Sequence, residues 1–185
     1  MLLGGGPDSC YCSFMTLYPY RDQYPKVSPS AFIAPTAVVI GDVDIGEEAS
    51  IWFHVTIRGD VHFIRIGAGT NIQDNSCIHV TRKTHPTVIG RGVTVGHSVT
   101  LHGCTLHDGC FIGMKACILD GAVVETGAYV AAGALVPPGK IVKAGELWAG
   151  TPARCMRLLA KEEIDFILVS EKNYIQLSRE YHRGC

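Results

Sequence analysis

The sequence predicts an all-β solenoid, a left-handed parallel β-helix of hexapeptide repeats followed by a C-terminal α-helix. Three observations predict this fold class. Aliphatic residues recur every six positions through most of the chain, a small residue usually stands four positions after each of them, and the last segment has the spacing of an amphipathic helix.

The six-residue period excludes the commoner patterns. An amphipathic helix would need a period near 3.6, and an isolated strand a period of 2 over one short run. In a triangular prism, each hexapeptide makes one short strand and one corner, its aliphatic residue points inward, and each coil pairs with the next at roughly 4.8 Å. A β-sandwich of short strands would not keep this phase for so long. The inward residues, here called anchors, are Ile33, Val39, Ile45, Ile51, Ile57, Ile66, Ile72, Ile78, Ile89, Val95, Leu101, Leu106, Ile112, Ile118, Val124, Val130 and Val136.

The small residues support the same prism, because the chain must turn a tight corner after each strand. Three intervals depart from the period: Ile57–Ile66, Ile78–Ile89 and Leu101–Leu106 measure nine, eleven and five residues. We expect loops or corner irregularities there, and insertions on a rigid solenoid are a usual place for function. The small residues are Ala37, Ala49, Thr70, Ser76, Cys110, Ala116, Ala122, Ala128 and Ala134.

The chain divides into three predicted segments. Residues 1–17 form a flexible N-terminal extension, 18–142 the β-helix, and 143–185 a linker and a C-terminal helix packed on the β-helix. Pro137-Pro138-Gly139 marks the end of regular coiling. The terminal helix is predicted from apolar residues at helical spacing, which are Ile164, Ile167, Leu168, Tyr174, Ile175 and Tyr181.

Composition excludes several classes of function. Lys and Arg total 16 against 17 Asp and Glu, and without a basic run we expect no nucleic-acid partner. No apolar stretch approaches the roughly 18 residues that cross a bilayer, and Met1–Phe14 does not resemble a secretory signal. We therefore expect no membrane partner and a cytoplasmic location, or a matrix location if the source has organelles. The eight cysteines include no C-x-x-C and are interpreted as reduced structural thiols.

Counting hexapeptides places two histidines in register. His79 and His102 each follow an anchor of one prism face by one residue, with Arg58 in the same column one coil earlier. A single histidine is more often a solvated surface residue, but two imidazoles at one-coil spacing can reach a single ion. His97 lies one prism face away, with Asp74 at the same phase one coil earlier. A threefold homotrimer could supply His97 from a neighbouring subunit.

These residues carry a resemblance to a known family. The motifs resemble those of the γ-class carbonic anhydrase-like hexapeptide-repeat family, and the similarity runs from about Tyr18 to Tyr181. The motifs that carry the resemblance are Arg58-Gly59-Asp60, Asn71-Ile72-Gln73-Asp74-Asn75, Ile78-His79, Gly96-His97, Leu101-His102-Gly103-Cys104 and Trp148-Ala149-Gly150-Thr151-Pro152-Ala153-Arg154.

The resemblance implies a metal site shared between subunits. His79 and His102 would bind the metal from one subunit and His97 from the next, with Zn²⁺ as the cofactor and Fe²⁺ or Co²⁺ as alternatives. It further implies an intersubunit ion pair between Arg58 and Asp60. Gln73 would hydrogen-bond the metal-bound water, and Asp74 would support a ligand or contact the neighbouring subunit.

The implied function is the reversible hydration of carbon dioxide to bicarbonate by metal-bound hydroxide. Three neutral histidines with an open fourth position lower the pKa of a bound water towards ~7. The most active family members carry a glutamate directly after the Arg-Gly-Asp motif and another in an acidic loop, whereas this chain has Val61 and a loop with Arg82, Lys83 and His85. Slow turnover is therefore predicted, with His62 or His85 as a partial proton shuttle.

Two other classes of function stay open. Acyl-CoA transferases use the same coil, and some relatives hydrolyse thioesters; a transferase needs one histidine as general base and no metal. The third class is a metal-stabilised, non-catalytic scaffold subunit. Metal content would separate the first class from the second, and hydration activity with metal bound would separate it from the third.

Overall fold

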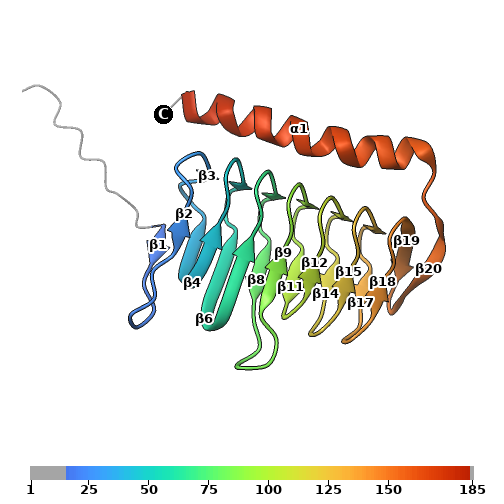
Figure 1. Cartoon of the computed structure of the whole chain (residues 1–185), viewed down its shortest axis with the longest axis horizontal. Helices are drawn as coiled ribbons and strands as arrows, with labels where there is room; N and C mark the ends of the chain where they lie inside the picture. Colours follow the sequence, from blue (N-terminus) through green and yellow to red (C-terminus); the bar gives the residue numbers. More distant parts are fainter. Residues whose placement is uncertain (1–15, 184–185) are drawn as a thin grey trace, which may run out of the picture.

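The computed structural model describes residues 16–183 and shows a parallel β-solenoid of about seven turns followed by one helix (Figure 1). This confirms the predicted fold class. Residues 1–15, which hold most of the predicted N-terminal extension, lie outside the described residues, as do residues 184–185. Within the described range, no helix combines the length and apolarity needed to cross a membrane.

The strands form three faces, because each coil contributes one strand to each face. The first face contains part of β6 (Thr56–Ile66), then β8 (Cys77–His79), β11 (Thr100–His102), β14 (Cys117–Ile118) and β17 (Leu135–Val136). The second contains the rest of β6, then β9 (Thr87–Ile89), β12 (Thr105–Leu106), β15 (Val123–Val124) and β18 (Ile141–Val142). The third contains β3 (Phe32–Ile33), β5 (Ser50–Ile51), β7 (Asn71–Ile72), β10 (Thr94–Val95), β13 (Phe111–Ile112), β16 (Tyr129–Val130) and β19 (Glu146–Gly150).

The N-terminal coil uses one long strand and two short ones. β4 (Val38–Ile45) pairs with β6 along both faces that β6 joins. β1 (Leu17–Tyr18) and β2 (Lys26–Val27) pair with the two ends of β4. Leu17, assigned from sequence to the extension, therefore lies in a strand that pairs with the solenoid, and its neighbour Thr16 accepts a hydrogen bond from the backbone nitrogen of Val39 at 2.8 Å.

The irregular intervals take different courses. The nine-residue interval is no loop, because β6 continues around the corner and pairs with β8 at Ile57 and with β9 at Ile66. The eleven-residue interval forms a loop between β8 and β9, closed by a bridge between Thr81 and His85, and this loop projects from the prism in Figure 1. Both intervals therefore lie at the corner between the first and second faces, on successive coils.

The anchors form the core of the prism. All of them are buried except Ile33, which is half-buried in the first coil. The small residues are buried as well, and the hydroxyl groups of two of them form hydrogen bonds inside the prism. The hydroxyls of Thr70 and Ser76 donate to the carbonyls of Gly90 and Gly96 in the next coil, at 2.7 and 3.1 Å. They therefore satisfy backbone groups at the corners.

The described cysteines are free thiols, in agreement with the predicted reduced state. Cys104 and Cys110 lie fully inside the prism. Burial raises the pKa of the Cys104 thiol to about 12, so this group stays neutral and behaves as a small apolar side chain.

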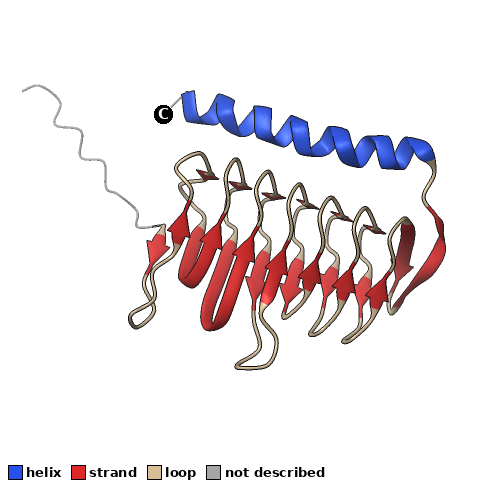
Figure 2. Ribbon diagram, viewed as in Figure 1, coloured by secondary structure: helices blue, strands red, loops and turns tan. Residues whose placement is uncertain are grey.

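The C-terminal segment returns along the third face. β20 (Ala153–Leu158) pairs antiparallel with β19, and α1 (Lys161–Arg183) then runs back towards the first coils (Figure 2). Its inner side buries Ile167, and Tyr181 packs edge-on against Trp52 with ring centroids 5.3 Å apart. The helix therefore contacts the third face through these side chains.

Candidate metal centre

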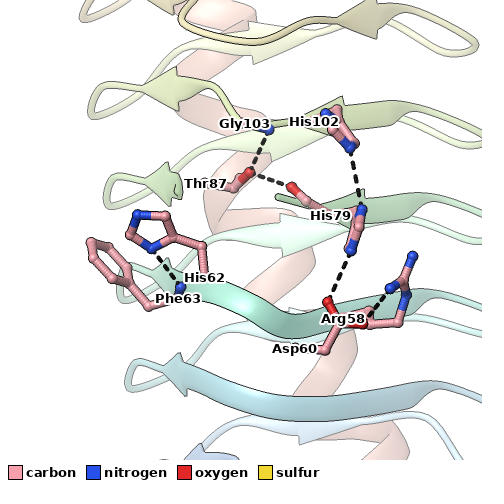
Figure 3. Close-up of polar contacts among 8 residues, drawn as sticks. All are labelled: Arg58, Asp60, His62, Phe63, His79, Thr87, His102 and Gly103. Carbon is pink, nitrogen blue, oxygen red and sulfur yellow. Dashed lines mark hydrogen bonds and ion pairs between the residues drawn. The ribbon is translucent and has the colours of Figure 1, made fainter. Parts of the chain in front are cut away.

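The two histidines of the predicted column lie side by side. β11 pairs with β8 so that His102 stands directly opposite His79, as the hexapeptide count predicts. The ring nitrogens His79 Nδ1 and His102 Nε2 face each other at 3.2 Å (Figure 3). Arg58 occupies the same column one coil earlier, because Ile57 pairs with Ile78.

A carboxylate backs the outer nitrogen of His79. Asp60 Oδ1 lies 3.1 Å from His79 Nε2, and Arg58 donates to the other oxygen of Asp60. Burial raises the pKa of the Asp60 carboxyl, but the hydrogen bonds from His79 and Arg58 outweigh it, so this pKa lies below its ordinary value. Arg58 and Asp60 thus pair within one chain, and the intersubunit form of this pair stays a prediction.

His102 has a carboxylate of its own, which sequence reasoning did not single out. Asp120 Oδ1 lies 2.6 Å from His102 Nδ1, and Thr81 donates to Asp120 Oδ2 at 2.7 Å. Burial raises the pKa of Asp120, whereas the hydrogen bonds from Thr81 and His102 lower it by more. The repeat could have identified Asp120 as a neighbour of His102. Ile118 pairs with Leu101, so Asp120 lies on the next coil close to His102.

One hydroxyl connects the backbones of the two histidine strands. Thr87 donates to the carbonyl of His79 at 2.6 Å and accepts from the backbone nitrogen of Gly103 at 3.0 Å (Figure 3). Thr87 is fully buried. The spacing between the two imidazoles is therefore set by backbone as well as by side-chain contacts.

His97 lies at the other edge of the first face, in the turn between β10 and β11. Its Nδ1 is 3.0 Å from Asp74 Oδ2. Gln73 is buried beside it and donates to Asn71 Oδ1 at 3.1 Å. Gln73 and His97 line a pocket of about 300 Å³ between the solenoid and α1, with Phe111, Tyr129, Phe166 and Tyr174 among the other lining residues.

The predicted site residues therefore form two groups in a single chain. Arg58, Asp60, His79 and His102 lie together at one edge of the first face, and Gln73, Asp74 and His97 at the other. Across residues 16–183, no three His, Cys, Asp or Glu side chains form a complete metal site.

His62 in β6 and His85 in the loop after β8 lie close to the first group. His62 accepts a hydrogen bond from the backbone of Phe63 at 2.9 Å and shares a pocket of about 280 Å³ with Asp60. His85 lies near enough to Asp120 to contribute to lowering its pKa. Both therefore flank the candidate site.

The donor set suits a divalent cation. An ionised carboxylate only accepts hydrogen bonds, so neutral His79 and His102 direct their N–H groups to Asp60 and Asp120. In neutral rings the two remaining nitrogens, His79 Nδ1 and His102 Nε2, would carry lone pairs, and these atoms lie 3.2 Å apart. Zn–N bonds of about 2.0–2.1 Å in a tetrahedral site place two ligand nitrogens roughly 3.3 Å apart. The observed separation of 3.2 Å is close to that distance.

Comparison with known proteins identifies close relatives. The chain is 52% identical over 171 residues to gamma carbonic anhydrase 1, mitochondrial, of Arabidopsis thaliana, covering 90% of this chain and 62% of the relative. It is 46% identical over 165 residues to a carbonic anhydrase of Geobacillus kaustophilus, covering 89% of this chain and 90% of the relative. The chain thus spans about six-tenths of the length of the Arabidopsis protein.

A solved structure shows the same fold. The hexapeptide transferase family protein from Anaplasma phagocytophilum has a TM-score of 0.87 and 51% sequence identity, covering 90% of this chain and 98% of that chain. No protein-family model matches the sequence.

Proposed function

We propose that this chain, which belongs to the γ-carbonic anhydrase-like hexapeptide-repeat family, is a metal-dependent enzyme for the reversible hydration of carbon dioxide. The observation that carries the proposal is the pair of facing imidazole nitrogens, with a carboxylate behind each ring. The names of the relatives support the reaction class, since two that the chain largely spans are called carbonic anhydrase or probable carbonic anhydrase.

The metal would be held by residues of two chains. His79 and His102 supply two nitrogens, and His97 of a neighbouring copy supplies the third, with Zn²⁺, or Fe²⁺ or Co²⁺, as the ion. When bound, such a cation acts as a Lewis acid that lowers the pKa of a coordinated water and makes it nucleophilic near neutral pH. Asp60 accepts the outer N–H of His79 and so keeps that ring oriented.

Gln73 would orient the water. Its Nε2 is engaged with Asn71, which leaves its Oε1 to accept a hydrogen bond from a water molecule near His97. Asp74 Oδ2 lies 3.0 Å from His97 Nδ1, so the opposite nitrogen of that ring is free of this contact and can bind the ion.

Proton removal is expected to limit the rate. Val61 and the loop of residues 80–86 provide no carboxylate at the two shuttle positions of the most active family members. We expect slow hydration in ordinary buffer and a rate that rises with imidazole concentration, because a small base can then accept the proton.

The test is a comparison of His102→Ala with His107→Ala. His107 is an exposed histidine five residues further along the chain, and its removal should leave metal binding and carbon dioxide hydration unchanged. Purified protein would be assayed for metal stoichiometry and for carbon dioxide hydration over a range of imidazole concentrations. His102→Ala should abolish metal binding and all imidazole-dependent hydration.

Two outcomes would overturn the proposal. Hydration that survives in His102→Ala would exclude the metal mechanism. A fully metallated wild-type protein that is inert at every imidazole concentration would favour a scaffold role. Metal-independent acyl transfer from an acyl-CoA would instead support the acyl-CoA transferase alternative.

A further inference from the structure

Each of the two histidines has a carboxylate at the ring nitrogen that does not face the other histidine: Asp60 at His79 Nε2 and Asp120 at His102 Nδ1. The two acids come from opposite directions along the solenoid. Asp60 approaches from the preceding coil on β6, and Asp120 from the following coil, just after β14. The resulting row of contacts runs Arg58, Asp60, His79, His102, Asp120 and Thr81.

The contact of Asp120 with His102 is close and directional. A 2.6 Å separation between Oδ1 and Nδ1 is short for a hydrogen bond between nitrogen and oxygen, as expected when the acceptor is charged. An ionised carboxylate has no proton to donate, so the Nδ1 atom of His102 must carry the hydrogen. Nε2 of the neutral ring then keeps its lone pair, and this is the atom that faces His79.

Thr81 fixes the carboxylate itself. Its hydroxyl donates to Asp120 Oδ2 at 2.7 Å, so both oxygens of Asp120 are engaged and the group cannot rotate away from the ring. Thr81 lies near the start of the inserted loop between β8 and β9, and the bridge from Thr81 to His85 closes that loop. The loop that replaces a regular corner therefore anchors Asp120.

We infer that Asp120 is a positioning residue that, held by Thr81, keeps His102 in the tautomer and orientation required to bind a metal through Nε2. This inference rests on the proposed metal site. Carboxylates that accept the outer N–H of a ligand histidine orient the ring and raise its basicity, and their loss typically weakens metal affinity by about 10–100-fold.

The experiment compares Asp120→Asn with Asp108→Asn in the full chain. Asp108 has the same place in its own hexapeptide, two residues after an anchor, but it accepts from the backbone nitrogen of Arg91 at 2.8 Å. Zn²⁺ affinity would be measured by competition with a chromophoric chelator. The His102 tautomer in the metal-free protein would be read from nitrogen-15 chemical shifts of the imidazole at a pH where the ring is neutral.

We expect Asp120→Asn to bind Zn²⁺ about 10–100-fold more weakly and to lose the uniform Nδ1–H tautomer of His102, with no change in Asp108→Asn. Thr81→Val should show a smaller loss of the same kind, and it provides a second variant if Asp120→Asn does not fold. Unchanged affinity and tautomer in Asp120→Asn would overturn the inference. A wild-type chain that binds none of Zn²⁺, Fe²⁺ and Co²⁺ would overturn the proposed function, whereas the tautomer measurement would still decide the role of Asp120.

Discussion

At the scale of single residues, the candidate site depends on the paired carboxylates as much as on the histidines. The pKa of both Asp60 and Asp120 lies below its ordinary value, because hydrogen bonds to each charged carboxylate outweigh its burial. Both groups are therefore ionised at neutral pH and accept from the rings. A histidine column without them would leave each ring free to adopt either tautomer.

Gly103 gives a residue-scale prediction. Its φ of 58° is in the left-handed region, and a Cβ there would lie 2.5 Å from Asp120 Oδ1 and 2.7 Å from His85 Cβ. We expect Gly103→Ala to weaken Zn²⁺ binding by about tenfold or more, because Asp120 must move away from His102. The added Cβ should also cost roughly 1–2 kcal/mol of folding free energy.

Gly127→Ala is the matched control for this change. Its φ of 65° imposes the same backbone strain, but a Cβ there meets nothing within 4 Å. Zn²⁺ titration and denaturant unfolding of the two variants would separate strain from contact. Equal Zn²⁺ affinities would show that Asp120 has room to adjust.

At the scale of elements, the start of α1 is held by one side chain. Glu163 accepts from the backbone nitrogen of Ala160 at 2.8 Å and pairs with Arg157 through both oxygens, at 2.7 and 2.9 Å. The contact with Ala160 is the return half of a capping box. Arg157 belongs to β20, so Glu163 joins the helix to the strand before it.

This arrangement predicts a pH dependence at the helix start. The hydrogen bonds from Arg157 and Ala160 lower the pKa of Glu163 to about 2, against an ordinary value of 4.5. Because the folded pKa lies below the unfolded one, the stabilisation is fully present above about pH 4.5 and is lost as the pH falls through about 2. Glu163→Gln should therefore speed amide hydrogen exchange in the first helical turn at neutral pH, and the difference from wild type should shrink towards pH 2.

Glu162→Gln serves as the control, since it removes the same charge from the same helical turn. Amide exchange in the first helical turn should change less in Glu162→Gln than in Glu163→Gln, because Glu162→Gln removes only the favourable interaction of a negative charge with the helix dipole. If both variants behave alike at every pH, the specific contacts of Glu163 contribute nothing beyond charge.

At the scale of the whole molecule, the two groups of site residues lie at opposite edges of the first face. His79 and His102 are the last residues of two strands of this face, and His97 precedes one of these strands. A rigid prism cannot fold one edge onto the other, whereas a threefold assembly can place the edge of one chain against the opposite edge of the next.

We therefore expect a homotrimer, with a mass by light scattering of about three times 19.9 kDa. Arg58→Ala should raise the protein concentration below which the trimer dissociates, because Asp60 Oδ2 would lose its cationic partner and only the contact of Oδ1 with His79 would remain. The cost should be about 3–5 kcal/mol if the pair is buried between subunits. Arg65→Ala is the control, since Arg65 pairs with Asp42 at 2.8 Å and Asp44 at 3.0 Å. A fully metallated monomer would contradict the shared site.

The sequence by itself determined the solenoid and the histidine column. A strict period leaves each residue only one place on the prism, so the register of His102 on His79, and of Asp74 with His97, follows from counting. The same count identified the buried anchors and small corner residues, because burial in a solenoid repeats with the sequence.

The tertiary structure decided what happens where the period fails. Counting cannot show whether an irregular interval becomes a strand around a corner, as in β6, or a loop, as between β8 and β9. Thr81 belongs to such a loop, and its hydrogen bond to Asp120 joins residues 39 positions apart. The pocket beside His97 likewise exists only because α1 folds back over the third face. These contacts depend on where an aperiodic segment packs, and the repeat carries no information about that.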